Sequence, residues 1–229
     1  MTKYPSYPNS MQSNQKSTSK FMTKFASGSS LIMAIAIACC IPTMPVQASL
    51  FDGPVDRLSS IERDSLRNGQ AVVTGDKGKY VARVLITASP DAVWQVLTDY
   101  ANLSKFIPNM TSSKILENRG DRKVIEQVDS RQVFIVSIVS RTKLSIQETN
   151  LKQIDFRLVD GDLDKMEGYW KMETVSAVPL GTPSQVLITY TVNAQPNSST
   201  PSDAFYGIFK EALGDTLQAI KKEVKSRHK

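Results

Sequence analysis

The stretch from residue 80 to residue 97, YVARVLITASPDAVWQVL, passes from a strand into a helix. Residues 80–87 are mostly apolar or β-branched, which is typical of a strand. The Ser-Pro-Asp sequence at 89–91 is a helix start, because serine caps free N–H groups, proline fits the first helical position and aspartate favours the positive helix end. The helix would carry Trp94 and Leu97 on one apolar face and end near 99–100. This stretch predicts a strand that leads directly into a short helix.

A second short helix and a long run of strands follow. The helix is expected over 102–106 and is stopped by Pro108. From residue 111 to residue 194 the apolar residues alternate with polar ones, which predicts an antiparallel sheet with one dry face and one wet face. A hairpin turn is predicted at 118–121 (Asn-Arg-Gly-Asp). Residues 133–146 are expected to form the longest single strand, and further strands are expected around 154–158, 166–173 and 186–192.

The chain ends in a long amphipathic helix. Thr200 is expected to cap it, with Pro201 and Asp203 in its first turn. One continuous stripe follows, made of Phe205, Ile208, Phe209, Ala212, Leu213, Thr216, Leu217, Ile220 and Val224. Only this helix is long enough to cover the dry face of the sheet. The element order therefore predicts an α+β fold, with a curved antiparallel sheet around a long C-terminal helix and two short helices after the first strand. The space between them is expected to form a cavity.

The first 48 residues differ in composition from the rest of the chain. They contain four lysines and no acidic residue, and they end in an apolar run at 31–41 followed by Val-Gln-Ala at 46–48. The run is shorter than the roughly 20 residues that span a bilayer. These features predict a signal peptide that is cleaved before Ser49.

Other interpretations of this leader stay open. The sequence Met22-Thr-Lys-Phe resembles the first four residues, Met-Thr-Lys-Tyr, so the start codon is either Met1 or Met22. Residues 36–39 form a weak lipobox, and an acid-free, serine-rich start also suits an organelle transit peptide. The mature chain is expected in the periplasm, the thylakoid lumen or the extracellular space. After the leader, we expect a lead-in segment at 49–69 and one domain at 70–229.

Removing the leader changes what charge and cysteine content imply. The formal net charge of the whole chain is +6, but the four leader lysines account for most of this positive excess. The basic pI therefore does not indicate a nucleic-acid partner. Cys39 and Cys40 also lie in the leader, which leaves no disulfide and no thiolate in the mature chain. The only histidine, His228, is at the C-terminus. We therefore expect no cofactor, no metal site and no histidine catalysis.

Five short motifs resemble those of a known family: Val93–Tyr100, Phe106–Pro108, Glu126–Val128, Glu167–Trp170 and Tyr190–Val192. Their order and spacing across residues 60–226 resemble the polyketide cyclase/dehydrase and coenzyme-Q-binding branch of the START-like (SRPBCC) superfamily. Within it, they resemble exported or plastid-type members from photosynthetic organisms. The resemblance implies a helix-grip fold with an internal apolar cavity for lipids, quinones or polyketides. It supplies no fixed catalytic motif, and the superfamily contains both binders and enzymes.

Eight residues are candidates for binding a ligand in such a cavity. Trp94 either stacks on a ligand ring or fills the core. Trp170 follows Gly168, where the strand can bend, and flexible methionine side chains beside it tolerate varied ligands. Glu126 shares a strand face with Val124, so it is either a polar handle paired with an arginine on a dry face or a solvated residue on the wet face. The candidates are Trp94, Phe106, Glu126, Met166, Trp170, Met172, Tyr190 and Phe209.

Three functions fit these observations. The first is a non-catalytic carrier of an apolar small molecule, such as a lipid, quinone or isoprenoid, in transient contact with membranes. The second is a polyketide cyclase or dehydratase that acts by positioning its substrate, with Glu126, Tyr190 and Asp99 as nominees for chemistry. The third is an assembly or interaction factor whose core is filled and whose apolar surface is exposed. The volume and the lining of the space beside residues 202–226 discriminate among these three functions. The sequence leaves the oligomeric state open.

Overall fold

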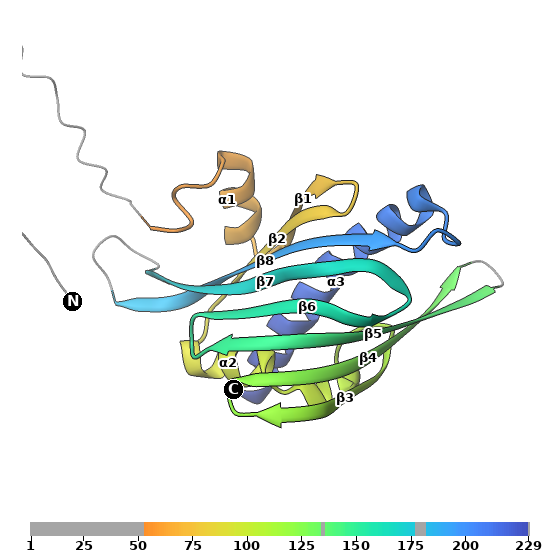
Figure 1. The fold of residues 1–229 in the computed structure, drawn as a ribbon. Coiled ribbons are helices and arrows are strands. Elements are labelled where there is room, and N and C mark those ends of the chain that lie inside the picture. Colours follow the sequence, from red (N-terminus) through yellow and green to blue (C-terminus); the bar gives the residue numbers. More distant parts are fainter. Residues whose placement is uncertain (1–52, 134–135, 177–181, 229) are drawn as a thin grey trace, which may run out of the picture. The chain divides into compact units, whose positions relative to one another are not determined.

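The computed structural model describes residues 53–133, 136–176 and 182–228 (Figure 1). The predicted leader at 1–48 lies outside the described residues, so its cleavage stays a prediction. In the described part, eight strands form one antiparallel sheet in the order β1-β2-β8-β7-β6-β5-β4-β3. The strands are β1 (Val72–Asp76), β2 (Lys79–Ile86), β3 (Met110–Arg119), β4 (Arg122–Val133), β5 (Val136–Thr149), β6 (Gln153–Gly161), β7 (Leu163–Ser176) and β8 (Pro183–Pro196).

The long helix α3 (Ser202–Arg227) runs across one face of this sheet (Figure 1). Two short helices follow β2, namely α2 (Pro90–Leu97) and the 3-10 helix η1 (Tyr100–Lys105). The arrangement confirms the predicted α+β helix-grip fold. Ser89 caps α2 as predicted, because its side chain accepts a hydrogen bond from the Ala92 N–H at 3.2 Å.

The start of α3 differs from the prediction by one position. Pro201 itself occupies the N-cap, and no side chain caps the helix there. Thr200 instead donates its hydroxyl to Asn197 Oδ1 at 2.9 Å, so it belongs to the loop before the helix.

The prediction of one strand over 133–146 was wrong. The chain reverses between Val133 and Val136, which face each other in register, so this stretch spans the end of β4 and the first part of β5. The predicted strand residue Phe134 lies outside the described residues. No glycine, proline or asparagine marks this reversal, and the apolar pattern continues through it.

The outer face of the sheet is partly covered by the lead-in segment. The helix α1 (Ser60–Arg67) and the residues before it bury Val55 and Leu66 against Leu85, Val175 and Leu187 of three strands. Glu62 accepts a hydrogen bond from Arg83 of β2 at 2.8 Å, which fixes the helix to the sheet. The lead-in segment predicted at 49–69 thus contains a helix, in which Ile61 is 78% exposed.

Candidate ligand-binding cavity

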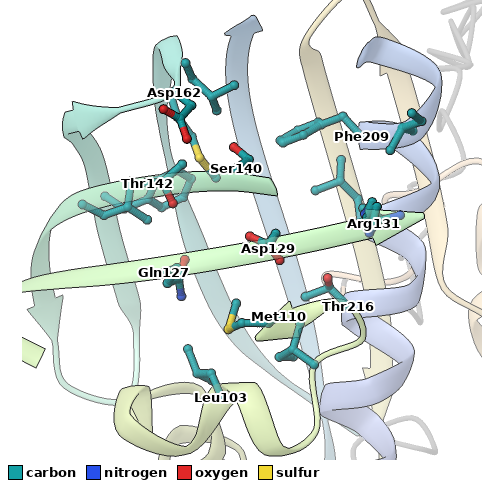
Figure 2. Close-up of a pocket in the computed structure, with 18 of the residues that line it drawn as sticks. Leu103, Met110, Gln127, Asp129, Arg131, Ser140, Thr142, Asp162, Phe209 and Thr216 are labelled. Atoms are coloured by element: carbon teal, nitrogen blue, oxygen red, sulfur yellow. The ribbon is translucent and has the colours of Figure 1, made fainter. Parts of the chain in front are cut away.

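A cavity of about 700 Å³ lies between α3, η1 and strands β4 to β8. Its volume is within the range of small-molecule sites in proteins. One end is closed by buried side chains, namely Leu97, Tyr100, Leu103, Ile107 and Ile220. The lining residues at the other end are exposed, and we call them the mouth: Val139, Asp162, Ser199, Pro201 and Ala204. Figure 2 shows Leu103 and Asp162 far apart along the cavity.

Three aromatic side chains form one wall of the cavity. Trp170 of β7 stacks on Tyr190 of β8 with ring centroids 3.8 Å apart, because the two residues face each other in register. The ring of Phe156 on β6 lies 5.6 Å from that of Tyr190. Gly168 makes room for this packing, since a Cβ there would collide with the Phe156 ring and with the carbonyl oxygen of Thr191. Burial, together with the negative charge of Asp129, raises the pKa of Tyr190.

Five polar side chains on two neighbouring strands form what we call the polar strip: Gln127, Asp129 and Arg131 of β4 and Ser140 and Thr142 of β5. Gln127 faces Thr142 in register, and Asp129 faces Ser140, so these four share one face of the sheet. Figure 2 shows the three β4 residues in a row along their strand. Beyond the strip toward the closed end, the same two strands carry Ile125 and Leu144, both buried.

The two charged residues of the polar strip have unusual surroundings. Burial raises the pKa of the Asp129 carboxyl to about 6, although the positive charge of Arg131 acts in the opposite direction. Within the described residues, neither side chain forms a hydrogen bond or an ion pair with another protein group. Their polar atoms therefore face the cavity without protein partners.

A second polar cluster lies at the closed end. The Tyr100 hydroxyl donates to Glu148 Oε1 at 2.9 Å, and Lys123 Nζ donates to the same oxygen at 2.7 Å. Lys123 and Glu148 are each only 13% exposed. Burial, followed by the charge of Glu148 and this hydrogen bond, raises the pKa of Tyr100. The cluster ties η1 to β4 and β5 and so helps to close this end.

Four of the eight predicted binding residues line the cavity: Met166, Trp170, Tyr190 and Phe209. Whether they bind a ligand stays a prediction. Of the other four, Trp94 is packed from α2 against the core, and Met172 is buried in that core beyond Trp170. Neither belongs to the cavity lining.

Phe106 and Glu126 also lie away from the cavity. Phe106 lines a separate surface cleft beside α3, where the guanidinium of Arg227 lies 5.6 Å from its ring. Glu126 belongs to the outer, wet face of β4 and accepts a hydrogen bond from Arg141 at 3.3 Å. Asp99, a nominee for chemistry, accepts a hydrogen bond from Arg227 at 2.8 Å and likewise does not line the cavity.

The sequence interpretation missed the polar strip. That interpretation left open whether the β4 face with Val124 and Glu126 is dry or wet, and it named no residue of the opposite face as a candidate. The signal that could have found the strip is the pairing of β4 with β5, which places Gln127 and Asp129 beside the inward residues of β5. Sequence alternation alone does not show that pairing.

In residues 53–133, 136–176 and 182–228, no three or more His, Cys, Asp or Glu side chains are grouped so as to hold a metal ion. Among the helices of the same described ranges, none has both the length and the apolar character of a membrane span.

Residues 86–221 match the family described as "Polyketide cyclase / dehydrase and lipid transport". The chain is 24% identical to the ribosome association toxin RatA of Escherichia coli (strain K12) over 136 residues, which are 59% of this chain and 80% of RatA. A START superfamily protein from Mycobacterium smegmatis has a similar fold, with a TM-score of 0.52, 18% identity and coverage of 69% of this chain and 99% of that one.

The Zhui aromatase/cyclase from Streptomyces sp. R1128 also has a similar fold, with a TM-score of 0.52, 16% identity and coverage of 69% of this chain and 96% of that one. At these identities, the solved structures show a shared fold and leave the activity open. The family match, by contrast, covers more than half of the chain. The chain therefore belongs to the polyketide cyclase/dehydrase and lipid transport family.

Proposed function

We propose that this protein binds and carries an apolar small molecule in the cavity beside α3. The observation that carries the proposal is the cavity itself, which measures about 700 Å³ and is closed at one end by buried apolar side chains. A protein interior is normally packed with few voids larger than a water molecule, so a space of this size needs an occupant or a function. The family description, which includes lipid transport, supports the same proposal.

A titration of delipidated protein with an apolar fluorescent probe tests the proposal. We expect micromolar or tighter binding with one probe for each chain. Ala212 of α3 lines the cavity, so Ala212→Trp should fill part of it and weaken binding at least tenfold. Glu211→Trp is the matched control, because Glu211 is exposed on the same helix and does not line the cavity. Absence of binding, or equal weakening by both variants, would refute the carrier proposal.

A cyclase or dehydratase is the second candidate, and Asp129 is the observation that favours it. A carboxyl with a pKa of about 6 inside a cavity can exchange protons near neutral pH, as general acid–base chemistry requires. Incubation with a linear β-polyketide thioester, followed by mass spectrometry of the products, tests this candidate. Cyclised or dehydrated product that is lost in Asp129→Asn supports it, and unchanged substrate contradicts it. The third function considered, a factor with a filled core, has no support from a domain that contains this cavity.

Lipids, quinones and isoprenoids are the ligand classes that we propose, with quinones included on the resemblance to coenzyme-Q-binding proteins. We also propose that the protein works outside the cytoplasm after its leader is removed. The support is the composition of residues 1–48. The intact mass of the protein from fractionated cells tests this proposal: a mature chain that begins at Ser49 supports it. A chain that retains the leader in the cytoplasmic fraction would contradict it.

A further inference from the structure

Asp129 and Arg131 give the cavity one negative and one positive group on the same strand. The two residues are two positions apart on β4, so both side chains point to the same face of the sheet. Both side chains are half-buried, and within the described residues neither forms a hydrogen bond or an ion pair, although the charge of Arg131 acts on the pKa of Asp129. In the empty cavity, water is expected to supply their hydrogen-bond partners. A bound molecule that displaces this water has to supply those partners instead.

The place of these residues along the cavity indicates how a ligand would lie. The polar strip is next to the mouth, whereas Leu97, Leu103 and Ile107 form the closed end. In Figure 2, Asp129 lies between Leu103 at one end and Asp162 at the other. A ligand with one polar end would bury its apolar part at the closed end and leave the polar end at the strip.

We propose, on the basis of the carrier function above, that the ligand is an uncharged amphiphile whose head group both donates and accepts hydrogen bonds. A hydroxyl group is the simplest such head. It donates to the Asp129 carboxylate and accepts from the Arg131 guanidinium, so both charged groups gain a partner. Gln127, Ser140 and Thr142 add groups of both kinds within the same strip.

Other head groups leave one of these charges unsatisfied. An anionic head, such as a fatty-acid carboxylate, meets the like charge of Asp129, and Asp162 adds a further carboxylate at the mouth. A cationic head, such as an amine, meets the like charge of Arg131. An ether accepts hydrogen bonds but cannot donate to Asp129. Asp129 and Arg131 thus act together as specificity-determining residues for an uncharged, donating head.

Four probes of one chain length test this inference: 1-tetradecanol, tetradecanoate, tetradecylamine and the methyl ether of tetradecanol. Each competes with the fluorescent probe for delipidated protein at pH 7.5, below its aggregation concentration. We expect the alcohol to bind about tenfold more tightly than each of the other three, because hydrogen bonds to charged groups are the stronger ones. If none of the four binds, the carrier function itself fails. If they bind but the acid, the amine or the ether equals the alcohol, only the head-group inference fails.

Two variants assign the preference to the strip. Asp129→Asn keeps the shape of the side chain but removes its charge and replaces one acceptor oxygen with an N–H donor, so the acid should gain affinity relative to the alcohol. Arg131→Gln should weaken the alcohol severalfold and strengthen the amine. Asp160→Asn is the matched control, since Asp160 lies on the outer face with Arg141 and Lys143 and should leave the ratios unchanged. An alcohol-to-acid ratio unaffected by Asp129→Asn overturns the inference.

Discussion

The two halves of the sheet differ in what lies between them and α3. On one side, β1, β2 and β8 contact the helix, and small or branched residues such as Ala82, Val84 and Ile188 are fully buried there. On the other side, β4 to β7 carry larger and more polar residues, and the cavity separates these strands and Tyr190 of β8 from the same helix. We call these the filled half and the hollow half. One helix therefore packs a core along one side and forms a cavity wall along the other.

The difference has a physical cause in the side chains. Small residues on β2 let the helix approach closely, and their burial stabilises the fold through the hydrophobic effect. Collapse of the hollow half would press Asp129 and Arg131 against the apolar face of α3 and remove them from water without partners. The polar strip thus opposes closure of the cavity, while the filled half supplies the stability that tolerates it.

The largest expected effect contrasts the two halves along α3. Leu217 is fully buried, so Leu217→Ala should lower the free energy of unfolding by about 3–4 kcal/mol. Ile208 faces the cavity and lacks packing partners on that side, so Ile208→Ala should cost about 1 kcal/mol in the delipidated protein. Urea unfolding monitored by circular dichroism gives both values. Equal losses would mean that the hollow half is packed as tightly as the filled half.

The next effect concerns the charge in the hollow half. The pKa of Asp129 is about 6 in the folded protein, above its ordinary value, so protonation favours the folded state. This contribution is complete below about pH 4 and is lost as the pH rises through about 6. Asp129→Asn cannot ionise, so it should raise the free energy of unfolding at pH 7.5 by about 1–3 kcal/mol and leave it nearly unchanged at pH 4.

Urea titrations at pH 4, 5, 6 and 7.5 measure this profile. Asp160→Asn is again the control, because the neighbouring Lys143 and Arg141 hold the pKa of Asp160 below its usual range. The control should therefore show no gain at pH 7.5. A parallel pH profile for wild type and Asp129→Asn would show that Asp129 is well solvated in the empty cavity.

The smallest effect concerns the closed end. Tyr100→Phe removes the hydroxyl that donates to Glu148 but keeps the ring in the cavity wall. Lys123 still pairs with Glu148, so the expected loss of stability is only about 1 kcal/mol. Probe affinity should stay within about twofold of wild type, because the hydroxyl bonds to Glu148 rather than to the ligand. A large loss of binding with normal stability would instead place this hydroxyl among the ligand contacts.

Much of the filled half could be predicted from the sequence, because its signals are local. Ser89 and Pro90 mark the start of α2, and Val186, Ile188 and Val192 alternate along β8 as buried strand residues do. Each of these signals is complete within a few neighbouring residues. The long apolar stripe of α3 likewise needed no knowledge of its partners.

The hollow half could not be predicted in the same way. On β4, Val124 and Val128 lie on the outer face while Gln127 and Asp129 face the cavity. The apolar residues of this strand therefore do not identify the face that points to the interior. The reversal between Val133 and Val136 was missed because no turn residue marks it. Which β4 residues face inward is decided by the pairing with β5, a contact between strands that alternation within one strand does not report.

The two tryptophans of the chain allow the most direct test of a ligand in the hollow half. Trp170 lies in the cavity wall, whereas Trp94 packs against the core from α2 and lies outside the wall. A long-chain alcohol brominated in mid-chain quenches indole fluorescence at short range. Titrated into Trp94→Phe, which retains Trp170, it should quench strongly and saturably; titrated into Trp170→Phe, which retains Trp94, it should quench weakly. Equal quenching of both variants, or quenching of neither, would contradict the account that the hollow half is the binding site.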